Sequence, residues 1–364
     1  YMIKEILEAG GIKTGLIGTV ENGFKGHMEE AEHTTPMSYE IQKWCRRMKD
    51  AGCKAVVMEV SSQGLMQYRV EGITFDLGIF TNISPDHIGE GEHKDFEEYL
   101  YWKSTLFKKC KTAIMNIDDP NWRNILGDHV PENLITFGYD PKADYHINHC
   151  RLLSRKGFLG LRYMINGQRI HLNIPGTFNS LNSAGAIAAA RCLGVDWRRI
   201  KTALREIKIR GRVERVEIGK DFTVLVDYAH NGVALERLLT SLRNYGPKRL
   251  LVVFGCGGNR DKNRRLEMGH AAATLADLAI ITSDNPRRED PAAIIKDIVG
   301  AVEEKGGAYI SISDRAEAIG WAVEHGEKGD VIVIAGKGHE TYQIIGEEKI
   351  HFDDREIILS MNRG

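Results

Sequence analysis

RLLVVFGC (Arg249–Cys256) is the segment that decides the fold of this 364-residue chain most directly. Five consecutive apolar residues, mostly branched or aromatic, predict a strand that is buried on both faces. Similar apolar runs recur downstream and upstream, in FTVLVDYA (222–229), LAIITS (278–283), AYISISD (308–314) and DVIVIAG (330–336). Segments of ordinary helix length separate them. Residues 209–364 are therefore predicted to form a Rossmann-like, doubly wound α/β domain, whose ligands bind beyond the carboxyl ends of its strands.

The first half of the chain also alternates strands with helices, although less regularly. Two apolar runs predict buried strands, KAVVMEV (54–60) and FDLGIFTNIS (75–84). Two segments with helical spacing are MSYEIQKWCRRMKDAG (37–52) and FEEYLYWKSTLFKK (96–109). This alternation predicts a mostly parallel sheet covered by helices.

Residues 150–176 break this rhythm, since their short apolar runs and an Asn-Gly pair predict β-hairpins. The small-residue helix FNSLNSAGAIAAARC (178–192) follows, and the strand–helix pattern restarts near IRGRVE (209–214). We therefore predict two α/β domains, 1–208 and 209–364. The first residues, YMIKEILEAGG, already read as an amphipathic helix with no preceding cap, which indicates a chain cut from something longer.

Composition narrows the class of protein. A net charge of −1 argues against a broad electrostatic surface for nucleic acid or anionic membrane. No apolar run reaches the length of a membrane span, and no signal peptide opens the chain. The six cysteines are dispersed without metal-type spacing, which favours free thiols in a reducing cytoplasm.

Polar clusters follow four of the predicted strands in the second half. They read VDYAHN, GCGGNRDKNRR, SDNPRRE and AGKGHE. Because parallel strands point their carboxyl ends to one edge of a sheet, we expect these clusters to meet there. Each cluster alone fits a solvated turn, but four together favour a binding site. In TSDNPRREDP (282–291) an acid and two arginines suit a ligand that carries both a carboxylate and an ammonium group.

The first half offers a weaker candidate site. MEVSSQGL ends one strand with Glu59 and two hydroxyls, and TNISPDHIGEGEH ends the next with Asp86 and His87. These residues could hold a divalent cation beside a phosphate, although histidine is unusual for Mg²⁺. Equally, Glu59 could cap a helix and His87 could be a turn residue. Lys103, in the apolar helix YLYWKSTLF, is by itself most simply a lysine with a solvated head.

Taken together, these motifs resemble the Mur ligase family of ATP-dependent, amide-bond-forming enzymes. The resemblance runs over residues 1–364. It rests on motifs in the family order, namely HTTP, EVSSQGL, NISPDH, GTFNSLNSAGAIAA, GRVE, VDYAH, GCGGNRDKNRR, SDNPR and AGKGHE. It implies a central ATPase-type domain, with a parallel sheet plus β-hairpins, followed by the Rossmann-like domain.

The resemblance also implies a reaction. In the family, ATP phosphorylates a carboxylate of a nucleotide-peptide, an incoming amine attacks the acyl-phosphate, and Mg²⁺ assists. The motifs are most similar to those of members that add meso-diaminopimelate to UDP-N-acetylmuramoyl-L-alanyl-D-glutamate during peptidoglycan synthesis in the cytoplasm. By resemblance, SDNPR is the diaminopimelate form of its motif, in which Arg287 would bind the distal carboxylate that lysine lacks.

Roles for individual residues follow from this resemblance. Glu59, His87 and a carbamylated Lys103 would bind Mg²⁺, and Lys103, His87 and His230 would be catalytic. The UDP-sugar-peptide would contact Thr34, Thr35, Ser61, Gln67 and Arg69. ATP would contact Asn179, Asn182, Arg212, Asp227 and His230. The amino acid would contact Arg260, Asp284, Asn285, Pro286, Arg287, Gly336 and Glu340.

The 364 residues depart from the family pattern in several places. They contain neither a uridine-binding N-terminal domain nor the P-loop that would precede the first helix, so we expect little ATP hydrolysis by these residues alone. His33 stands where asparagine is common, and HNGVAL lacks the usual proline. Three alternatives remain: a lysine-adding ligase, a folylpolyglutamate-type ligase that the EVSSQGL and SDNPR motifs disfavour, and a truncated binding protein without catalysis.

Overall fold

The computed structural model describes residues 1–84, 88–89, 92–155 and 158–361. By the clustering of its internal contacts the chain forms two compact units. Unit 1 comprises Tyr1–Arg151, Arg162–Leu172 and Thr177–Ile207, and unit 2 comprises Leu152–Leu161, Asn173–Gly176 and Lys208–Gly364. The assignment of residues 1–208 and 209–364 to two domains stays a prediction. None of the helices in the described ranges combines the length and the hydrophobicity that crossing a membrane requires.

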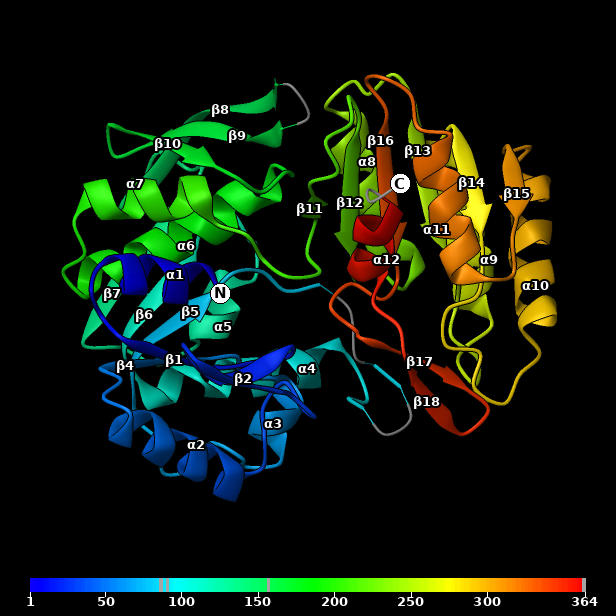
Figure 1. Ribbon diagram of the computed structural model, residues 1–364. Helices are drawn as coiled ribbons and strands as arrows, with labels where there is room; N and C mark the ends of the chain where they lie inside the picture. Colours follow the sequence, from blue (N-terminus) through cyan, green and yellow to red (C-terminus); the bar gives the residue numbers. More distant parts are fainter. Residues whose placement is uncertain (85–87, 90–91, 156–157, 362–364) are drawn as a thin grey trace. The chain divides into compact units, whose positions relative to one another are not determined.

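Among the described residues, unit 1 holds seven α-helices and the first ten strands, apart from the parts of β8 and β9 that belong to unit 2 (Figure 1). Its helices are α1 Met2–Ala9, α2 Ser38–Asp50, α3 Ser62–Met66, α4 Phe96–Thr105, α5 Trp122–Leu126, α6 Phe178–Cys192 and α7 Trp197–Glu206, with a 3₁₀ turn at Phe107–Lys109. Its strands are β1 Thr14–Ile17, β2 Glu21–Phe24, β3 His27–Glu30, β4 Ala55–Met58, β5 Phe75–Phe80, β6 Cys110–Asn116, β7 Asn133–Gly138, β8 Tyr145–Arg155, β9 Phe158–Ile165 and β10 Gln168–Leu172.

These strands form two sheets rather than the single sheet predicted from the sequence. One has the order β3-β2-β1-β4, in which only β1 and β4 run parallel, and the other has the order β10-β9-β8-β7-β6-β5. The prediction that β4 and β5 are buried is wrong for β4, where Val56 is 41% exposed. The physical reason is position, because β4 and β5 each lie at the edge of a sheet and lack a neighbouring strand on one side.

The predicted hairpin is present at the far end of the six-stranded sheet. Asn166 and Gly167 between β9 and β10 have φ values of 47° and 74°. Positive φ at both central residues is what a tight hairpin turn requires, and Asn-Gly adopts it most readily. The Asn-Gly pair therefore predicted this turn for the correct physical reason.

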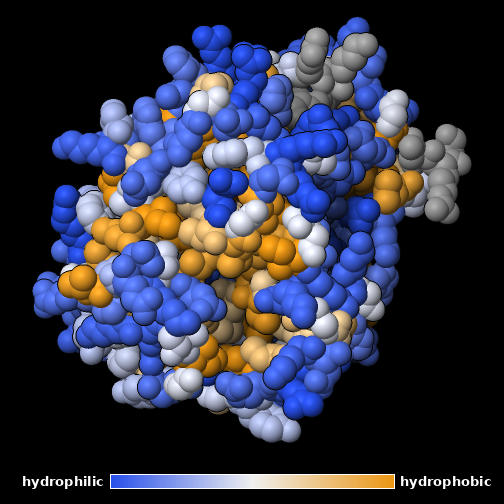
Figure 2. Space-filling model, turned by 90° about the vertical axis from the view of Figure 1, so that its left-hand side faces the viewer, coloured by the Kyte–Doolittle hydropathy of each residue, from blue (hydrophilic) through white to orange (hydrophobic). Residues whose placement is uncertain are grey.

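Helix α6 packs against β5, β6 and β7, and most of its residues are buried. Its small side chains permit this close approach, since a Cβ on Gly185 would lie 3.1 Å from the ring of Phe137. Elsewhere hydrophobic side chains reach the surface. Figure 2 shows, on the face that it displays, hydrophobic residues gathered in a continuous area that hydrophilic residues surround.

Unit 2 contains the doubly wound sheet. The strands of unit 2 are β11 Glu214–Val216, β12 Thr223–Asp227, β13 Leu250–Phe254, β14 Leu278–Ile281, β15 Tyr309–Ser311 and β16 Val331–Ala335, with β17 Tyr342–Ile345 and β18 Glu348–His351 in a separate pair. Its helices are α8 Gly232–Arg243, α9 Asn263–Leu275, α10 Pro291–Glu304, α11 Arg315–Glu324 and α12 Asp354–Ser360. The sheet order is β11-β12-β16-β13-β14-β15, with every pair parallel except β11–β12. The predicted α/β fold is confirmed.

Alternating side chains of this sheet enter two separate cores. Leu250, Val252 and Phe254 pack with α8, α9 and α10, whereas Leu251 and Val253 pack with α11 and α12. A strand with both faces covered needs apolar residues at every position, which explains the uninterrupted run LLVVF. The carboxyl ends of β12, β13, β14 and β16 are thereby fixed at one edge of the sheet.

Candidate active site

The four polar clusters of unit 2 meet in one pocket, as expected from the strand directions. The pocket has a volume of about 280 Å³. Residues from all four clusters line it, among them His230 after β12, Cys256 after β13, Asp284 after β14 and Glu340 after β16. Six of the seven predicted amino-acid-binding residues are included: Arg260, Asp284, Asn285, Arg287, Gly336 and Glu340. The seventh, Pro286, does not line the pocket; its carbonyl oxygen lies against Gly258.

Asp284 lines this pocket and has a buried acceptor. The residue lies shortly after the end of β14 and is only 9% exposed. One carboxylate oxygen, Oδ1, accepts a hydrogen bond of 2.7 Å from the backbone N–H of Asn285. The other, Oδ2, has no hydrogen-bond partner among the described residues although it is buried. A buried oxygen that lacks a partner is costly, so this one is suited to a donor from a ligand.

Gly336 allows the strand ends to approach each other at this point. Its φ is 113°, a conformation that other residues rarely adopt, and a Cβ there would lie 2.8 Å from Asp284 Oδ2. Only a residue without a side chain avoids crowding the carboxylate. The glycine of AGKGHE is therefore needed both for its backbone conformation and for the space that it leaves.

Two arginines in the pocket have no carboxylate partner in the described part of the chain. Arg287 donates from Nη1 to the carbonyl oxygen of Gly258 at 2.9 Å, and neither Arg260 nor Arg287 forms an ion pair with a described residue. The φ of Arg287 is 54°, and its backbone is held by hydrogen bonds to Ile344 and from Gly346. A residue fixed in a left-handed conformation often belongs to a functional site. The two cations are thus available to an anionic ligand.

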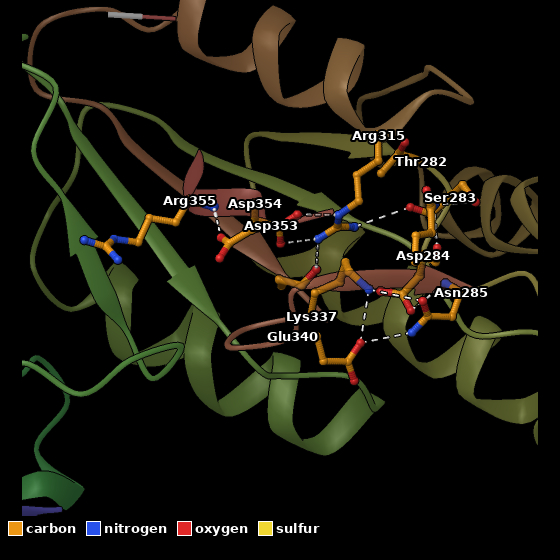
Figure 3. A network of polar contacts seen from close by, with 12 residues as sticks. Thr282, Ser283, Asp284, Asn285, Arg315, Lys337, Glu340, Asp353, Asp354 and Arg355 are labelled. Atoms are coloured by element: carbon orange, nitrogen blue, oxygen red, sulfur yellow. Dashed lines mark hydrogen bonds and ion pairs between the residues drawn. The ribbon is translucent and has the colours of Figure 1, made fainter. Parts of the chain in front are cut away.

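Glu340, Asn285 and Lys337 form a closed set of hydrogen bonds (Figure 3). Lys337 is fully buried, and its Nζ lies 3.0 Å from Glu340 Oε2 and 3.1 Å from Asn285 Oδ1. The amide of Asn285 also donates to Glu340 Oε2 at 3.0 Å. One oxygen of Glu340 is therefore occupied by protein donors. The sequence placed Lys337 in a polar cluster but gave it no role, because a buried partner cannot be read from a loop motif.

The residues predicted to bind ATP are divided between the two units. Asp227 accepts hydrogen bonds of 2.8 Å from the backbone N–H groups of Val213 and Ala229, one on each oxygen. Burial raises the pKa of its carboxyl group, and these two hydrogen bonds act in the opposite direction. Because both oxygens are occupied, Asp227 orders the backbone at the end of β12.

Arg212 and His230 both lie close to the ring of Tyr228. The guanidinium carbon of Arg212 is 5.1 Å from the centre of that ring, and the centre of the His230 ring is 4.6 Å from it. Such a group of flat side chains is suited to stacking against a planar ligand. Asn179 and Asn182 belong to unit 1, where the two amides are joined by a hydrogen bond of 3.0 Å on α6.

Unit 1 brings together the residues predicted to bind the nucleotide-peptide. Thr35 Oγ1 donates to the carbonyl oxygen of Glu59 and accepts from the N–H of Ser61, both at 2.9 Å. Arg69 donates to the carbonyl oxygen of Thr35 at 2.6 Å and to the side chain of Gln67 at 2.9 Å. Ser61 caps α3 through its side chain, and Thr34 contacts the Thr19 hydroxyl at 3.1 Å.

The predicted metal ligands are described only in part. Glu59 is exposed, and its Oε2 accepts from the hydroxyl and the N–H of Thr19 at 2.5 and 3.1 Å. Lys103, on α4, is partly buried, with Nζ 5.6 Å from the Tyr99 ring, and His87 lies outside the described residues. No group of three or more metal-binding side chains occurs in the ranges that the structure covers. An exposed carboxylate beside a threonine hydroxyl nevertheless fits Mg²⁺, which often takes one or two protein ligands and completes its shell with water and phosphate oxygens.

His93 is a buried polar residue that the sequence did not single out. It is fully buried, and its Nε2 lies 2.8 Å from the Ser62 hydroxyl, next to the Ser61 cap. Its ring packs 5.3 Å from that of Tyr99 on α4. A lone histidine in GEGEH carries no local signal of burial, so only the fold could reveal this contact.

Comparison with known proteins identifies the family. A family model described as the Mur ligase middle domain matches residues 1–190, and one described as the Mur ligase glutamate ligase domain matches residues 211–338. The chain belongs to the Mur ligase family. Mur ligases of this kind are ATP-dependent enzymes that join an acid to an amino acid.

Two curated Mur ligases illustrate how similar the sequences are. The chain is 43% identical to UDP-N-acetylmuramoyl-L-alanyl-D-glutamate--2,6-diaminopimelate ligase 1 of Clostridium acetobutylicum, over 98% of this chain and 74% of that protein. It is 41% identical to the corresponding ligase of Clostridium perfringens, over 100% and 75%. A solved structure of a ligase with the same name is 30% identical, with a TM-score of 0.71 over 99% of this chain and 74% of that one. The predicted family is confirmed.

Proposed function

We propose that this Mur ligase joins meso-diaminopimelate to UDP-N-acetylmuramoyl-L-alanyl-D-glutamate in peptidoglycan synthesis. The pocket of unit 2 carries the proposal, because Asp284, which has an unpartnered carboxylate oxygen, lines the same cavity as Arg260 and Arg287. An amino-acid group needs an acceptor for its ammonium and a cationic donor for its carboxylate. Diaminopimelate carries two such groups, and lysine lacks the distal carboxylate. The names of the relatives support this substrate.

The proposed reaction proceeds in two steps. An oxygen of the dipeptide carboxylate forms a bond to the γ-phosphorus of ATP, and the bond to the bridging oxygen breaks to release ADP. The neutral amine of diaminopimelate then forms a bond to the acyl carbon, phosphate leaves with the shared electron pair, and the nitrogen loses its proton. Mg²⁺, when bound, stabilises the negative charge on the phosphate oxygens.

Each unit contributes part of this chemistry. In unit 1, Thr34, Thr35, Ser61, Gln67 and Arg69 would hold the nucleotide-peptide, while Glu59 and His87 would hold Mg²⁺. ATP would contact Asn179 and Asn182 from unit 1, and Arg212, Asp227 and His230 from unit 2. Asp227 would act by ordering the backbone, because both of its oxygens already accept hydrogen bonds.

In this proposal Lys103 is a carbamate. Its neutral amine adds to the carbon of CO₂ and releases a proton, which converts a cationic side chain into an anionic one that can support Mg²⁺. The reaction is tested by ¹³C NMR of the protein in ¹³C-labelled bicarbonate. We expect one protein-bound carbamate signal that is absent in Lys103→Ala and still present in Lys108→Ala, a neighbouring exposed lysine. Equal spectra for the three proteins would contradict this role.

Substrate choice is tested by calorimetric titration of the 364-residue chain with meso-diaminopimelate and with L-lysine. We expect diaminopimelate to bind at least about tenfold more tightly, since each 1.4 kcal/mol corresponds to a factor of ten. Tighter binding of lysine would support the lysine-adding alternative. Failure to bind either amino acid would contradict the assignment of the pocket.

Catalysis is tested in a fusion that adds, before Tyr1, the uridine-binding domain and the P-loop that the family pattern leads us to expect. With ATP, Mg²⁺, nucleotide-peptide and diaminopimelate, mass spectrometry should detect the product extended by one diaminopimelate. Binding without product would instead favour a binding protein.

The six cysteines are free thiols, which supports a reducing location such as the cytoplasm.

A further inference from the structure

A fully buried ion pair lies beneath the pocket of unit 2. Arg315 is the first residue of α11 and Asp354 the first residue of α12, and both side chains are 0% exposed. Their groups meet through two parallel contacts of 2.7 Å, Nε to Oδ1 and Nη2 to Oδ2. Removing two charges from water is costly, and this cost can exceed the attraction between them, so a buried ion pair need not stabilise the folded state. Its presence therefore suggests another contribution.

The remaining donors of Arg315 bind the backbone at two strand ends (Figure 3). Nη2 donates to the carbonyl oxygen of Ala335, the last residue of β16, at 3.0 Å. Nη1 makes a longer contact of 3.5 Å with the carbonyl oxygen of Ser283, just past β14. In the sheet β13 separates these two strands, so one planar group connects backbones that are not paired with each other.

The two residues that follow these carbonyl groups are Asp284 and Gly336, which line the pocket. Their separation is critical, because a Cβ on Gly336 would already be only 2.8 Å from Asp284 Oδ2. A small displacement of either strand end would therefore move the unpartnered oxygen relative to the ligand. Misplacement by about 1 Å is enough to reduce the efficiency of a site by as much as 100-fold.

Other contacts also act on this separation. Gln343 of β17 donates to the carbonyl oxygen of Asp284 at 2.6 Å, and Asn285 N–H binds its Oδ1, so both hold the β14 side. The Asn285 side chain joins the two loops through Lys337 and Glu340. Arg315 differs from these side chains because it contacts main-chain carbonyl groups at both strand ends, in the backbone that carries Asp284 and Gly336.

We propose that Arg315 is a positioning residue for the amino-acid pocket, and that Asp354 is the counter-ion that fixes its orientation. Together with the Asn285 side chain, the guanidinium sets the distance between Asp284 and Gly336 and so the position of the carboxylate that receives the ligand ammonium. This inference rests on the proposed function, in which the pocket binds an amino acid. Arg315 touches no ligand itself and acts through the two carbonyl groups.

The test uses two variants of the 364-residue chain. In the double variant Arg315→Met with Asp354→Leu, apolar side chains of similar size replace the pair, a change that other buried pairs have tolerated. In Arg315→Lys the ammonium can still reach Asp354 but cannot bind both carbonyl groups. We expect both proteins to bind meso-diaminopimelate about tenfold more weakly than the wild type, by analogy with the groups that orient metal ligands, whose loss typically changes metal affinity by 10–100-fold.

A matched control comes from the opposite end of the same strands. Arg249 and Asp330 precede β13 and β16 and form an ion pair with contacts of 2.5 and 3.0 Å. Arg249→Met with Asp330→Leu should alter the melting temperature but leave diaminopimelate affinity within about twofold of the wild type, since the pocket lies at the other edge. Binding of ATP, measured in all of the variants, should also stay within this range.

Asp284→Asn separates failure of the inference from failure of the proposed function. If this variant loses diaminopimelate binding but Arg315→Lys and a folded double variant keep wild-type affinity, the positioning role is wrong and the pocket assignment stands. If Asp284→Asn also keeps wild-type affinity, the pocket assignment itself is wrong. Should the double variant not fold, unchanged binding in Arg315→Lys alone overturns the inference.

Discussion

Gly336 shows how much the pocket depends on a single residue. Its φ of 113° and its closeness to Asp284 Oδ2 are two separate reasons against a side chain. We expect Gly336→Ala to lower the free energy of unfolding by about 1–3 kcal/mol, the usual cost of a residue in such a conformation. The added methyl group should also prevent diaminopimelate binding.

Gly246→Ala provides the control for this substitution. Gly246 has a φ of 63°, and no atom lies within 4 Å of the position that an added methyl group would take. It should therefore show a loss of stability of about 1–2 kcal/mol from the backbone alone, with normal binding. Chemical denaturation and calorimetry of the two variants distinguish strain from crowding, and equal binding by both would contradict the role of Gly336.

Arg287 is the residue expected to distinguish diaminopimelate from lysine. Arg287→Ala should weaken diaminopimelate binding by about 2–5 kcal/mol, because it leaves a buried carboxylate without its charged partner. Lysine binding should change little, since lysine has no distal carboxylate. Titration with both amino acids measures the difference.

Arg288 is a suitable comparison because it is adjacent, 73% exposed and paired with Glu347 at the surface. A pair of this kind contributes at most about 1 kcal/mol, so Arg288→Ala should bind both amino acids like the wild type. If Arg287→Ala weakens the two substrates equally, Arg287 supports the loop and does not read the distal carboxylate.

At the scale of helices, α7 provides a test of pH dependence. The side chain of Asp196 accepts from the N–H of Arg199 at the start of the helix, and these backbone hydrogen bonds lower the pKa of its carboxyl group. An acid whose pKa is lower in the folded state stabilises above its unfolded pKa and loses this contribution as the pH falls through the folded value. The Asp196→Ala protein should thus be less stable than the wild type at pH 7.

This difference should shrink below about pH 3.8, where the unfolded carboxyl group becomes protonated. Asp196→Asn keeps a capping oxygen without the charge, and its stability relative to Asp196→Ala should vary little with pH. Urea denaturation of the three proteins between pH 7 and pH 3 gives the comparison. A difference that stays constant throughout would show that the charge of Asp196 plays no part.

Some strands are predictable from their sequence pattern and others are not. The strand LLVVF was predictable because both of its faces are covered, which leaves an unbroken apolar run. The sheet of β1 to β4 was not, because ENGF and HMEE in β2 and β3 have neither apolar runs nor clean alternation. The same holds for the hairpin β17–β18, in which β18 is exposed throughout, although β17 holds the backbone of Arg287. Local patterns report burial, and these strands are defined by their pairing.

Some residues of the candidate site could be predicted from the sequence, and others could not. Its pocket-lining residues follow strands, so motif positions such as Asp284, Arg287 and Glu340 could be proposed from sequence. The groups beneath them could not, because Arg315 and Asp354 are 39 positions apart and neither belongs to a strand-end motif. Their contact depends on how α11 and α12 pack on one face of the sheet. Long-range polar pairing of this kind is decided by tertiary structure.

At the scale of the whole molecule, the two units should respond to different ligands. Within the described ranges, the residues that line the amino-acid pocket all belong to unit 2, and the predicted nucleotide-peptide contacts Thr34 to Arg69 lie in unit 1. A ligand that binds only the folded state stabilises the part it binds, by about 2.7 kcal/mol at a concentration 100 times its Kd. Since regions of one protein open with different free energies, this protection need not spread through the chain.

Hydrogen exchange followed by mass spectrometry can therefore locate each site. Saturating meso-diaminopimelate should slow exchange in the segments that follow β14 and β16. Exchange in the segment from Thr34 to Arg69, which includes α2, should stay unchanged. UDP-N-acetylmuramoyl dipeptide should give the reverse pattern. The Arg287→Ala protein is the internal control, because diaminopimelate at the same concentration should protect it much less while the dipeptide protects it normally. Protection of unit 1 by diaminopimelate in the absence of nucleotide would contradict a pocket confined to unit 2, because ligand binding stabilises the residues whose folded arrangement it requires.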